Sequence, residues 1–107
     1  MAQIIVGIAD MRLASEPDEV LVTHALGSCL GITIFDPVAG VGGMLHAMLP
    51  LSTIDPEKAK NSPFMFIDTG VPKLFIAAYK LGAKKERIIL TVTGGATTRA
   101  KDSDDFF

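Results

Sequence analysis

One stretch of this chain has the spacing of an amphipathic helix, and it limits how the other residues can fold. From Phe64 to Leu81, apolar residues recur every three or four positions, which is typical of one buried helical face. Ser62 and Pro63 suit an N-cap and a first helical residue, and Gly82 suits a C-cap. The sequence therefore predicts one long helix in this part of the chain.

Two residues within this stretch disfavour a regular helix. Gly70 adds backbone freedom, and Pro72 lacks the N–H group that an interior helical position uses. Their presence predicts either a kink in the helix or a later start, near Asp68.

The chain before the helix is made of short apolar runs separated by turns, which is the pattern of β-strands. We expect strands over residues 3–9, 18–25, 28–35 and 44–49, a glycine-rich hairpin turn over 38–43, a polar surface loop with one helical turn over 51–61, a last strand over 87–92 and a tight turn at 94–95. Strands, then a helix, then a strand indicate an α/β domain with a largely antiparallel sheet.

Composition restricts the class of protein. With 107 residues, 49% of them hydrophobic, the chain fits one small globular domain. The net charge of -2 and the lack of a large basic cluster argue against nucleic-acid binding. We expect Lys84, Lys85 and Arg87 to act only as charges at a helix end.

Cysteine content and apolar run length bear on location. A single cysteine excludes an internal disulfide, and no apolar run reaches the length of a secretory signal core or a membrane span. These features predict a cytoplasmic protein without membrane insertion. One Cys and two His give too few ligands for a metal site, and the phosphate-loop patterns are absent, so we expect no metal and no cofactor.

The most unusual segment surrounds the only thiol, Cys29, which Gly27 and Gly31 flank. A thiol becomes a nucleophile as thiolate, which requires a base, a cation or aligned amides nearby. If the strands over 28–35 and 44–49 pair as a hairpin, His46 returns close to Cys29, whose partner lies a few residues past His46. Taken alone, this pattern favours a buried apolar cysteine and a core histidine over a cysteine hydrolase.

Two longer runs change that balance. The run THALGSCLGITIFDP starts at Thr23, and the run GVGGMLHAMLP contains His46. Together they resemble the CheD family, the chemoreceptor glutamine deamidases. The segment YKLGA ending at Ala83 and the GGA turn beginning at Gly94 are similar to later parts of that family.

The resemblance implies a catalytic set of Thr23, Cys29 and His46, and a fold like the catalytic domain of cytotoxic necrotizing factor, a β-sheet sandwich flanked by helices. It implies methyl-accepting chemotaxis receptors as substrates and the CheC phosphatase as a partner. The family's domain continues past the equivalent of Phe107, so residues 1–107 are expected to form a single CheD-like domain that lacks its C-terminal portion.

The expected mechanism is hydrolysis of receptor glutamines to glutamate and ammonia. Cys29 attacks the carboxamide carbon, His46 transfers the protons, and Thr23 orients His46 through its hydroxyl or its carbonyl. Backbone N–H groups from Gly27 through Ser28 to Cys29 are the expected oxyanion donors. Two alternatives stay open: an interaction module that binds CheC and receptors, and an esterase that acts on receptor methyl esters.

Overall fold

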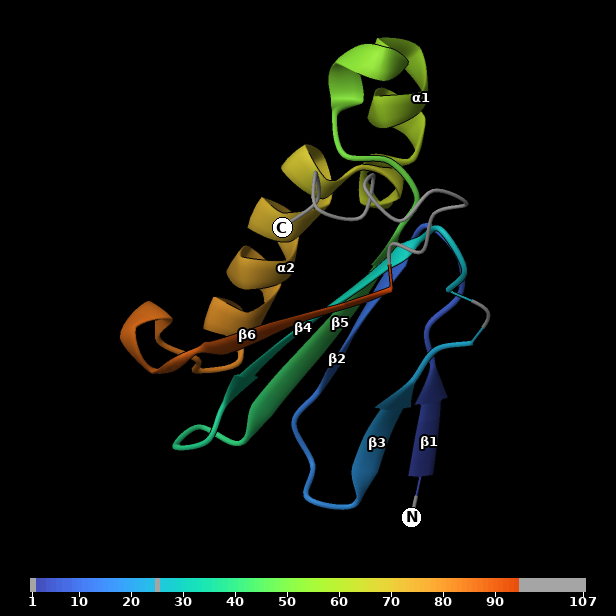
Figure 1. The fold of residues 1–107 in the computed structure, drawn as a ribbon. Helices are drawn as coiled ribbons and strands as arrows, with labels where there is room; N and C mark the ends of the chain where they lie inside the picture. The colour runs from blue at the N-terminus through green and yellow to red at the C-terminus, as the bar shows by residue number, and fades with distance from the viewer. Residues whose placement is uncertain (1, 25, 95–107) are drawn as a thin grey trace.

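The computed structural model describes residues 2–24 and 26–94, and it is a mixed α/β fold. The strands are β1 (Ala2–Ile5), β2 (Asp10–Ala14), β3 (Glu19–Val22), β4 (Leu30–Asp36), β5 (Val41–Ala47) and β6 (Ile89–Gly94). The helices are α1 (Pro56–Asn61) and α2 (Ile67–Lys80), with short 3-10 turns η1 (Ser52–Ile54), η2 (Pro63–Met65) and η3 (Lys85–Arg87). Figure 1 shows their arrangement.

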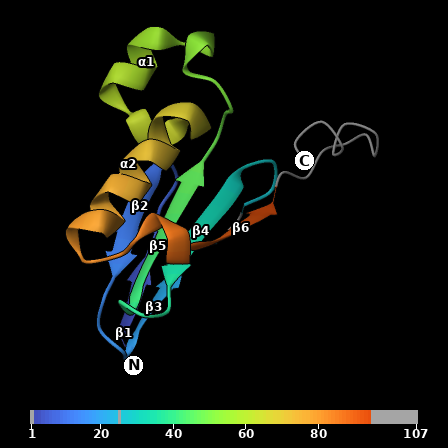
Figure 2. The ribbon, with the colours of Figure 1, turned by 90° about the vertical axis from the view of Figure 1, so that its left-hand side faces the viewer.

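The main sheet has four antiparallel strands in the order β2-β5-β4-β6, which confirms the α/β class and the antiparallel sheet. A second sheet holds only β1 and β3, and these two strands are parallel. Helix α2 packs on β5 along one face of the main sheet, as Figure 2 shows, and β3 contacts β2 and β5. The second layer, formed by β1 and β3, is therefore much smaller than we expected for a β-sheet sandwich.

Several boundaries differ from the expectations. Strand β2 was missed, although Asp10 and Arg12 alternate with Met11 and Leu13, which pack against the core, because this alternation covers only four residues and two of them are charged. The hairpin turn spans residues 37–40, so Gly42 and Gly43 lie within β5 instead of the turn. Residues 51–61 form η1 and α1, which is more helix than one turn. The predicted turn at 94–95 extends outside the described residues.

Helix α2 takes the later of the two expected starts. It begins at Ile67, and Pro63 opens the separate turn η2 instead. Gly82 caps the helix as predicted, with a φ of 103°, and its N–H donates to the Tyr79 carbonyl at 3.0 Å. Gly70 has a packing reason, since a Cβ there would lie 2.9 Å from a methyl carbon of Leu45.

Alternation along β5 divides the main sheet into two faces. Leu45 belongs to the buried core under α2, together with Ile32, Ile34 and Leu74. Side chains of neighbouring residues in a strand point to opposite faces. His46 therefore points to the face away from α2, the face that β3 partly covers.

Asp36 at the end of β4 ties the hairpin to the segment after α2. It is fully buried, and its carboxylate accepts hydrogen bonds from the N–H groups of Val38, Ala39 and Lys84 at 2.8–3.1 Å. The Arg87 guanidinium reaches the same carboxylate at 2.9 Å. Arg87 is thus an ion-pair partner rather than only a charge at a helix end.

This network predicts a specific acid sensitivity. The hydrogen bond from Arg87 holds the pKa of Asp36 below its ordinary 3.8, so the folded protein favours the carboxylate. A lowered pKa stabilises the fold above the ordinary value, and that contribution is lost as the pH falls below it. Asp36→Asn should lower the midpoint of urea unfolding at neutral pH, and the difference from wild type should shrink as the pH drops below 3.8.

The control is Asp18→Asn, because Asp18 is exposed. That variant should unfold like wild type at each pH. A difference between Asp36→Asn and wild type that stays constant down to strongly acidic pH would contradict the role given to the carboxylate.

Candidate active site

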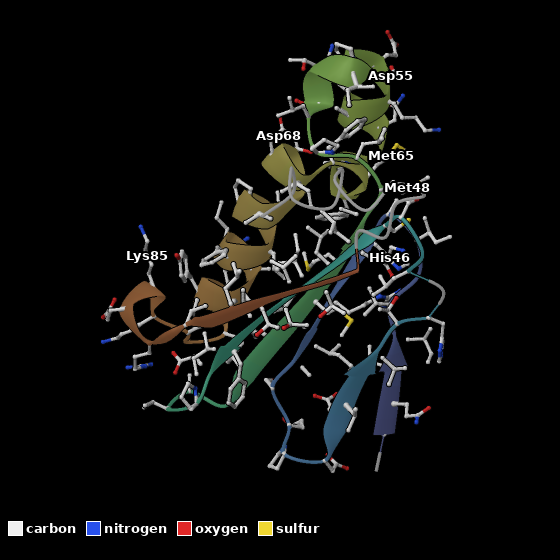
Figure 3. All side chains as sticks on the ribbon, in the orientation of Figure 1. His46, Met48, Asp55, Met65, Asp68 and Lys85 are labelled. Carbon is white, nitrogen blue, oxygen red and sulfur yellow. The ribbon has the colours of Figure 1, made fainter. Side chains whose placement is uncertain are left out.

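His46 lies in a row of residues that crosses the main sheet. Its register partners are Asp10 on β2 and Gly31 on β4, and Thr93 on β6 is the partner of Gly31. Figure 3 shows His46 towards the end of β5 that is remote from the hairpin turn. Because Gly31 has no side chain, β4 itself places no side chain beside the imidazole. Only residues from loops can occupy that position.

The imidazole is fully buried and is held from one side by Thr23. Its Nδ1 atom is 2.8 Å from the Thr23 hydroxyl oxygen, and that hydroxyl lies 2.7 Å from the Val6 carbonyl oxygen. Thr23 follows β3 and Val6 follows β1, and the Val6 N–H donates to the Val22 carbonyl at 2.8 Å. The small parallel sheet therefore presents Thr23 to the histidine.

These contacts assign the tautomer of His46. A carbonyl oxygen only accepts, and a hydroxyl has one hydrogen to donate. The Thr23 hydroxyl donates it to Val6, so the hydrogen between Thr23 and His46 comes from Nδ1. The neutral imidazole then carries its lone pair on Nε2.

The Nε2 atom is buried and has no hydrogen-bond partner among the described residues. A buried nitrogen without a partner costs about 1–3 kcal/mol, so each such atom in a folded protein calls for an explanation, of which a catalytic role is one. A lone pair kept free in this way is suited to accept a proton from a neighbouring group.

Cys29 lies immediately before β4, two residues from Gly31, the partner of His46. It is a free, partly buried cysteine. Its place in the chain is diagonal to His46, two residues before the register partner of that histidine. The hairpin pairing confirms the expected return of β5 to this cysteine, although no Cys29–His46 hydrogen bond occurs among the described residues. Catalytic hydrogen bonds are often long before substrate binds.

A tight turn precedes Cys29. The Cys29 N–H donates to the Leu26 carbonyl at 2.6 Å, and Gly27 has a φ of 49°, a conformation that glycine adopts easily. The Cys29 amide is therefore already used within the turn. Of the three N–H groups expected to donate to the oxyanion, those of Gly27 and Ser28 remain candidates, and both residues are exposed.

Three other observations complete the site. His24 is exposed, whereas its neighbour Thr23 contacts His46. Within residues 2–24 and 26–94, no group of three His, Cys, Asp or Glu side chains has the arrangement of a metal site. The roles of the Val6 carbonyl and of Leu26 were missed, since a backbone acceptor leaves no sequence signal and a leucine suggests only packing.

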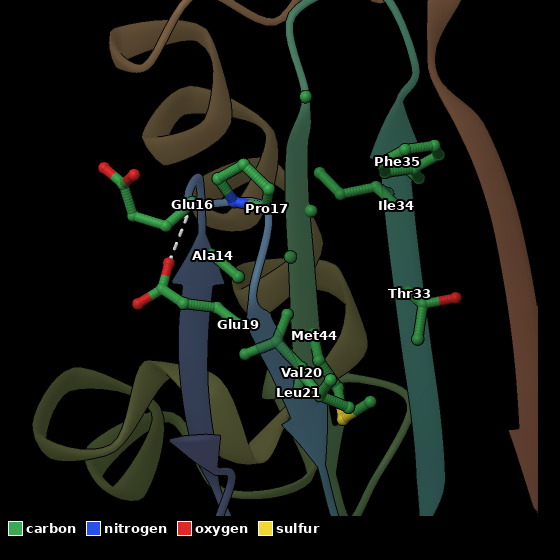
Figure 4. Close-up of a pocket in the computed structure, with 13 residues that line it drawn as sticks. Ala14, Glu16, Pro17, Glu19, Val20, Leu21, Thr33, Ile34, Phe35 and Met44 are labelled. Atoms are coloured by element: carbon green, nitrogen blue, oxygen red, sulfur yellow. Dashed lines mark hydrogen bonds between the residues drawn. The ribbon is translucent and has the colours of Figure 1, made fainter. Parts of the chain in front are cut away.

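A groove adjoins the site on the same face of the sheet. It has a volume of about 460 Å³ and runs between β3 and the β4–β5 hairpin, with Val20 on one side and Met44, Thr33 and Phe35 on the other. Figure 4 shows these side chains with Glu16 and Glu19 at the rim. Met44 is two residues from His46 on β5, but Thr23, Cys29 and His46 themselves do not line the groove.

An α/β domain with a buried histidine hydrogen-bonded to a threonine, and with a free cysteine at the start of the neighbouring strand, has the components of a thiol-dependent hydrolase. Comparison with known proteins identifies its family. The family model described as CheD chemotactic sensory transduction matches residues 48–107. The chain belongs to the CheD family, as its two motif runs predicted.

Curated relatives agree with this family. The chain is 54% identical to the "Probable chemoreceptor glutamine deamidase CheD" of Solibacter usitatus over 91% of its length, and 50% identical to "CheD 1" of Syntrophus aciditrophicus over all of it. It is 43% identical to "CheD 2" of Anaeromyxobacter dehalogenans over 91%. The chain spans 57%, 66% and 61% of these relatives, respectively.

One further observation concerns membranes. No helix within the described residues is long and apolar enough to cross a bilayer.

The Thr23 contacts predict how the thiol should react. Thr23→Val keeps the shape and removes the hydroxyl, so Nδ1 loses its partner and the tautomer is no longer fixed. If Cys29 and His46 form a pair, alkylation of Cys29 by iodoacetamide near neutral pH should slow by about tenfold or more. Thr23→Ser, which keeps the hydroxyl, should react like wild type. Equal rates for Thr23→Val and wild type would contradict the orienting role.

Proposed function

We propose that this protein hydrolyses glutamine side chains of methyl-accepting chemotaxis receptors to glutamate and ammonia. The observation that carries the proposal is the buried, unpartnered Nε2 of His46, with its tautomer fixed by Thr23 and with Cys29 two residues from its register partner. The names of the curated relatives supply the substrate.

In the first half-reaction, Nε2 of His46 takes the thiol proton while the Cys29 sulfur bonds to the carboxamide carbon. The carbonyl oxygen gains negative charge, and in this proposal the amides of Gly27 and Ser28 donate to it. The C–N bond then breaks, and His46 gives its proton to the leaving nitrogen. The products are ammonia and a thioester on Cys29.

Water completes the cycle. His46 takes a proton from a water molecule, and the oxygen of that water attacks the thioester carbon. The C–S bond then breaks. The same proton passes to the departing sulfur. The receptor side chain is now glutamate, and Cys29 and His46 have returned to their starting protonation states.

The burial of His46 suits this task. A fully buried imidazole is kept from bulk water. The Thr23 hydroxyl also accepts the Nδ1 hydrogen when the ring is protonated, which holds the imidazolium in the same orientation.

Three parts of the proposal stay predictions: the cytoplasmic location, the partnership with CheC, and the likeness in fold to the cytotoxic necrotizing factor catalytic domain. The same holds for the division of the chain, a single CheD-like domain lacking its C-terminal portion. An interaction module and a receptor methylesterase stay the alternative functions. The methylesterase would use the same cysteine and histidine on an ester carbon.

The test is mass spectrometry of a receptor cytoplasmic fragment incubated with the chain. Wild type should add about one dalton at particular glutamines, the change from amide to acid, and Cys29→Ala should not. His46→Ala should lose about a hundredfold or more of the rate, and His24→Ala should stay near wild type. A fragment with glutamate methyl esters, assayed in parallel, separates deamidase from esterase.

The full-length Syntrophus aciditrophicus relative is the positive control for the substrate. If that relative deamidates the fragment and this folded chain does not, the proposed activity is wrong for this chain. If Cys29→Ala keeps the activity, the mechanism is wrong.

A further inference from the structure

Two glycines beside the candidate site leave room for one side chain, Leu26. A Cβ on Gly31 would lie 3.3 Å from both terminal methyl carbons of Leu26. A Cβ on Gly94 would lie 3.3 Å from the Leu26 Cβ and would collide with the Cys29 carbonyl oxygen. Gly94 also has a φ of 95°, which side chains other than glycine rarely adopt.

The register shows where this space lies. Gly31 stands between His46 on β5 and Thr93 on β6, on the face away from α2. The Leu26 side chain thus fills the position next to the imidazole that a side chain on β4 would otherwise take. Gly94 is the register partner of Leu30, the residue after Cys29, and a Cβ on it would meet the same leucine, at 3.4 Å from a terminal methyl carbon of Leu26.

The backbone of Leu26 is joined to the nucleophile as well. Its carbonyl accepts the Cys29 N–H at 2.6 Å across the turn that Gly27 makes. One residue is therefore linked to Cys29 by its main chain and fixed on the sheet by its side chain.

We propose that Leu26 is a positioning residue for Cys29. Its side chain sits on Gly31 and Gly94, and this contact holds the turn from Leu26 to Cys29 so that the thiol stays within reach of His46 Nε2. The inference rests on the proposed function only in taking Cys29 and His46 as the reacting pair. In this proposal, Gly31 and Gly94 make room for the Leu26 side chain, whereas Gly27 makes the turn before Cys29.

The proposal predicts an effect on reactivity rather than on substrate binding. A displacement of about 1 Å in a reacting group can cost about a hundredfold in rate. Leu26→Ala empties the space over Gly31 and leaves the turn free to shift. It should lower kcat by about tenfold to a hundredfold and change KM much less.

The decisive comparison uses four forms of the full chain: wild type, Leu26→Ala, Gly31→Ala and the double variant. A methyl group on Gly31 pushes against Leu26 but has room when residue 26 is alanine. Gly31→Ala should thus be harmful in the wild-type background and much less so alongside Leu26→Ala, a non-additive result. Leu26→Met, which refills the space, should recover most of the activity.

Three readouts are needed: kcat and KM of deamidation, the pH profile of Cys29 alkylation by iodoacetamide, and Tm. Leu26→Ala should slow alkylation at neutral pH and move its pH profile upward, because the thiol loses its base. A lower Tm with unchanged kcat and alkylation profile would overturn the proposal, and so would strictly additive effects of the two alanine changes.

The two proposals fail in different ways. Alkylation measures the position of the thiol without any receptor substrate. If wild type does not deamidate, the alkylation profiles of the four forms still decide the role of Leu26. If Cys29→Ala deamidates, the proposed cysteine mechanism fails whatever Leu26 does.

Discussion

The Thr23 hydroxyl joins the small parallel sheet to the main sheet, and the chemistry of the site depends on that contact. This hydroxyl donates its single hydrogen to the Val6 carbonyl, which can only accept. The hydrogen between Thr23 and His46 therefore comes from Nδ1. The buried Nε2 is left with its lone pair. A two-stranded layer that adds little to the core thus decides the protonation pattern of a histidine in the other layer.

Glycines decide what surrounds that histidine. Gly43 and Gly70 let α2 approach the sheet closely on one face, because a Cβ on Gly43 would lie 2.8 Å from Leu74 of α2 and one on Gly70 would lie 2.9 Å from Leu45 of β5. On the other face, Gly31 clears the position beside His46 that Leu26 fills. Glycines of the main sheet therefore allow tight core packing on one face and the close approach of Leu26 on the other.

The sequence was informative where a local signal exists. It predicted the helix, its cap at Gly82 and the hairpin that returns His46 towards Cys29, because helical periodicity and strand-turn-strand patterns are local. It missed β2, whose polar–apolar alternation is short, and it placed Gly42 and Gly43 in a turn, although packing against Leu74 explains Gly43 better. The parallel pairing of β1 with β3 and the use of the Val6 carbonyl arise from contacts between distant segments, which no local pattern encodes.

The central claim is that Thr23 fixes the Nδ1–H tautomer of His46, and ¹⁵N NMR of the imidazole tests it directly. The measurement uses the Cys29→Ala variant, in which no thiol can share a proton with His46. The exposed His24 serves as an internal reference with mixed tautomers. At a pH where His46 is neutral, the account predicts a protonated Nδ1 and a bare Nε2. A protonated Nε2 with a bare Nδ1 would contradict it, because the nitrogen facing the reaction space would then have no lone pair for the thiol proton.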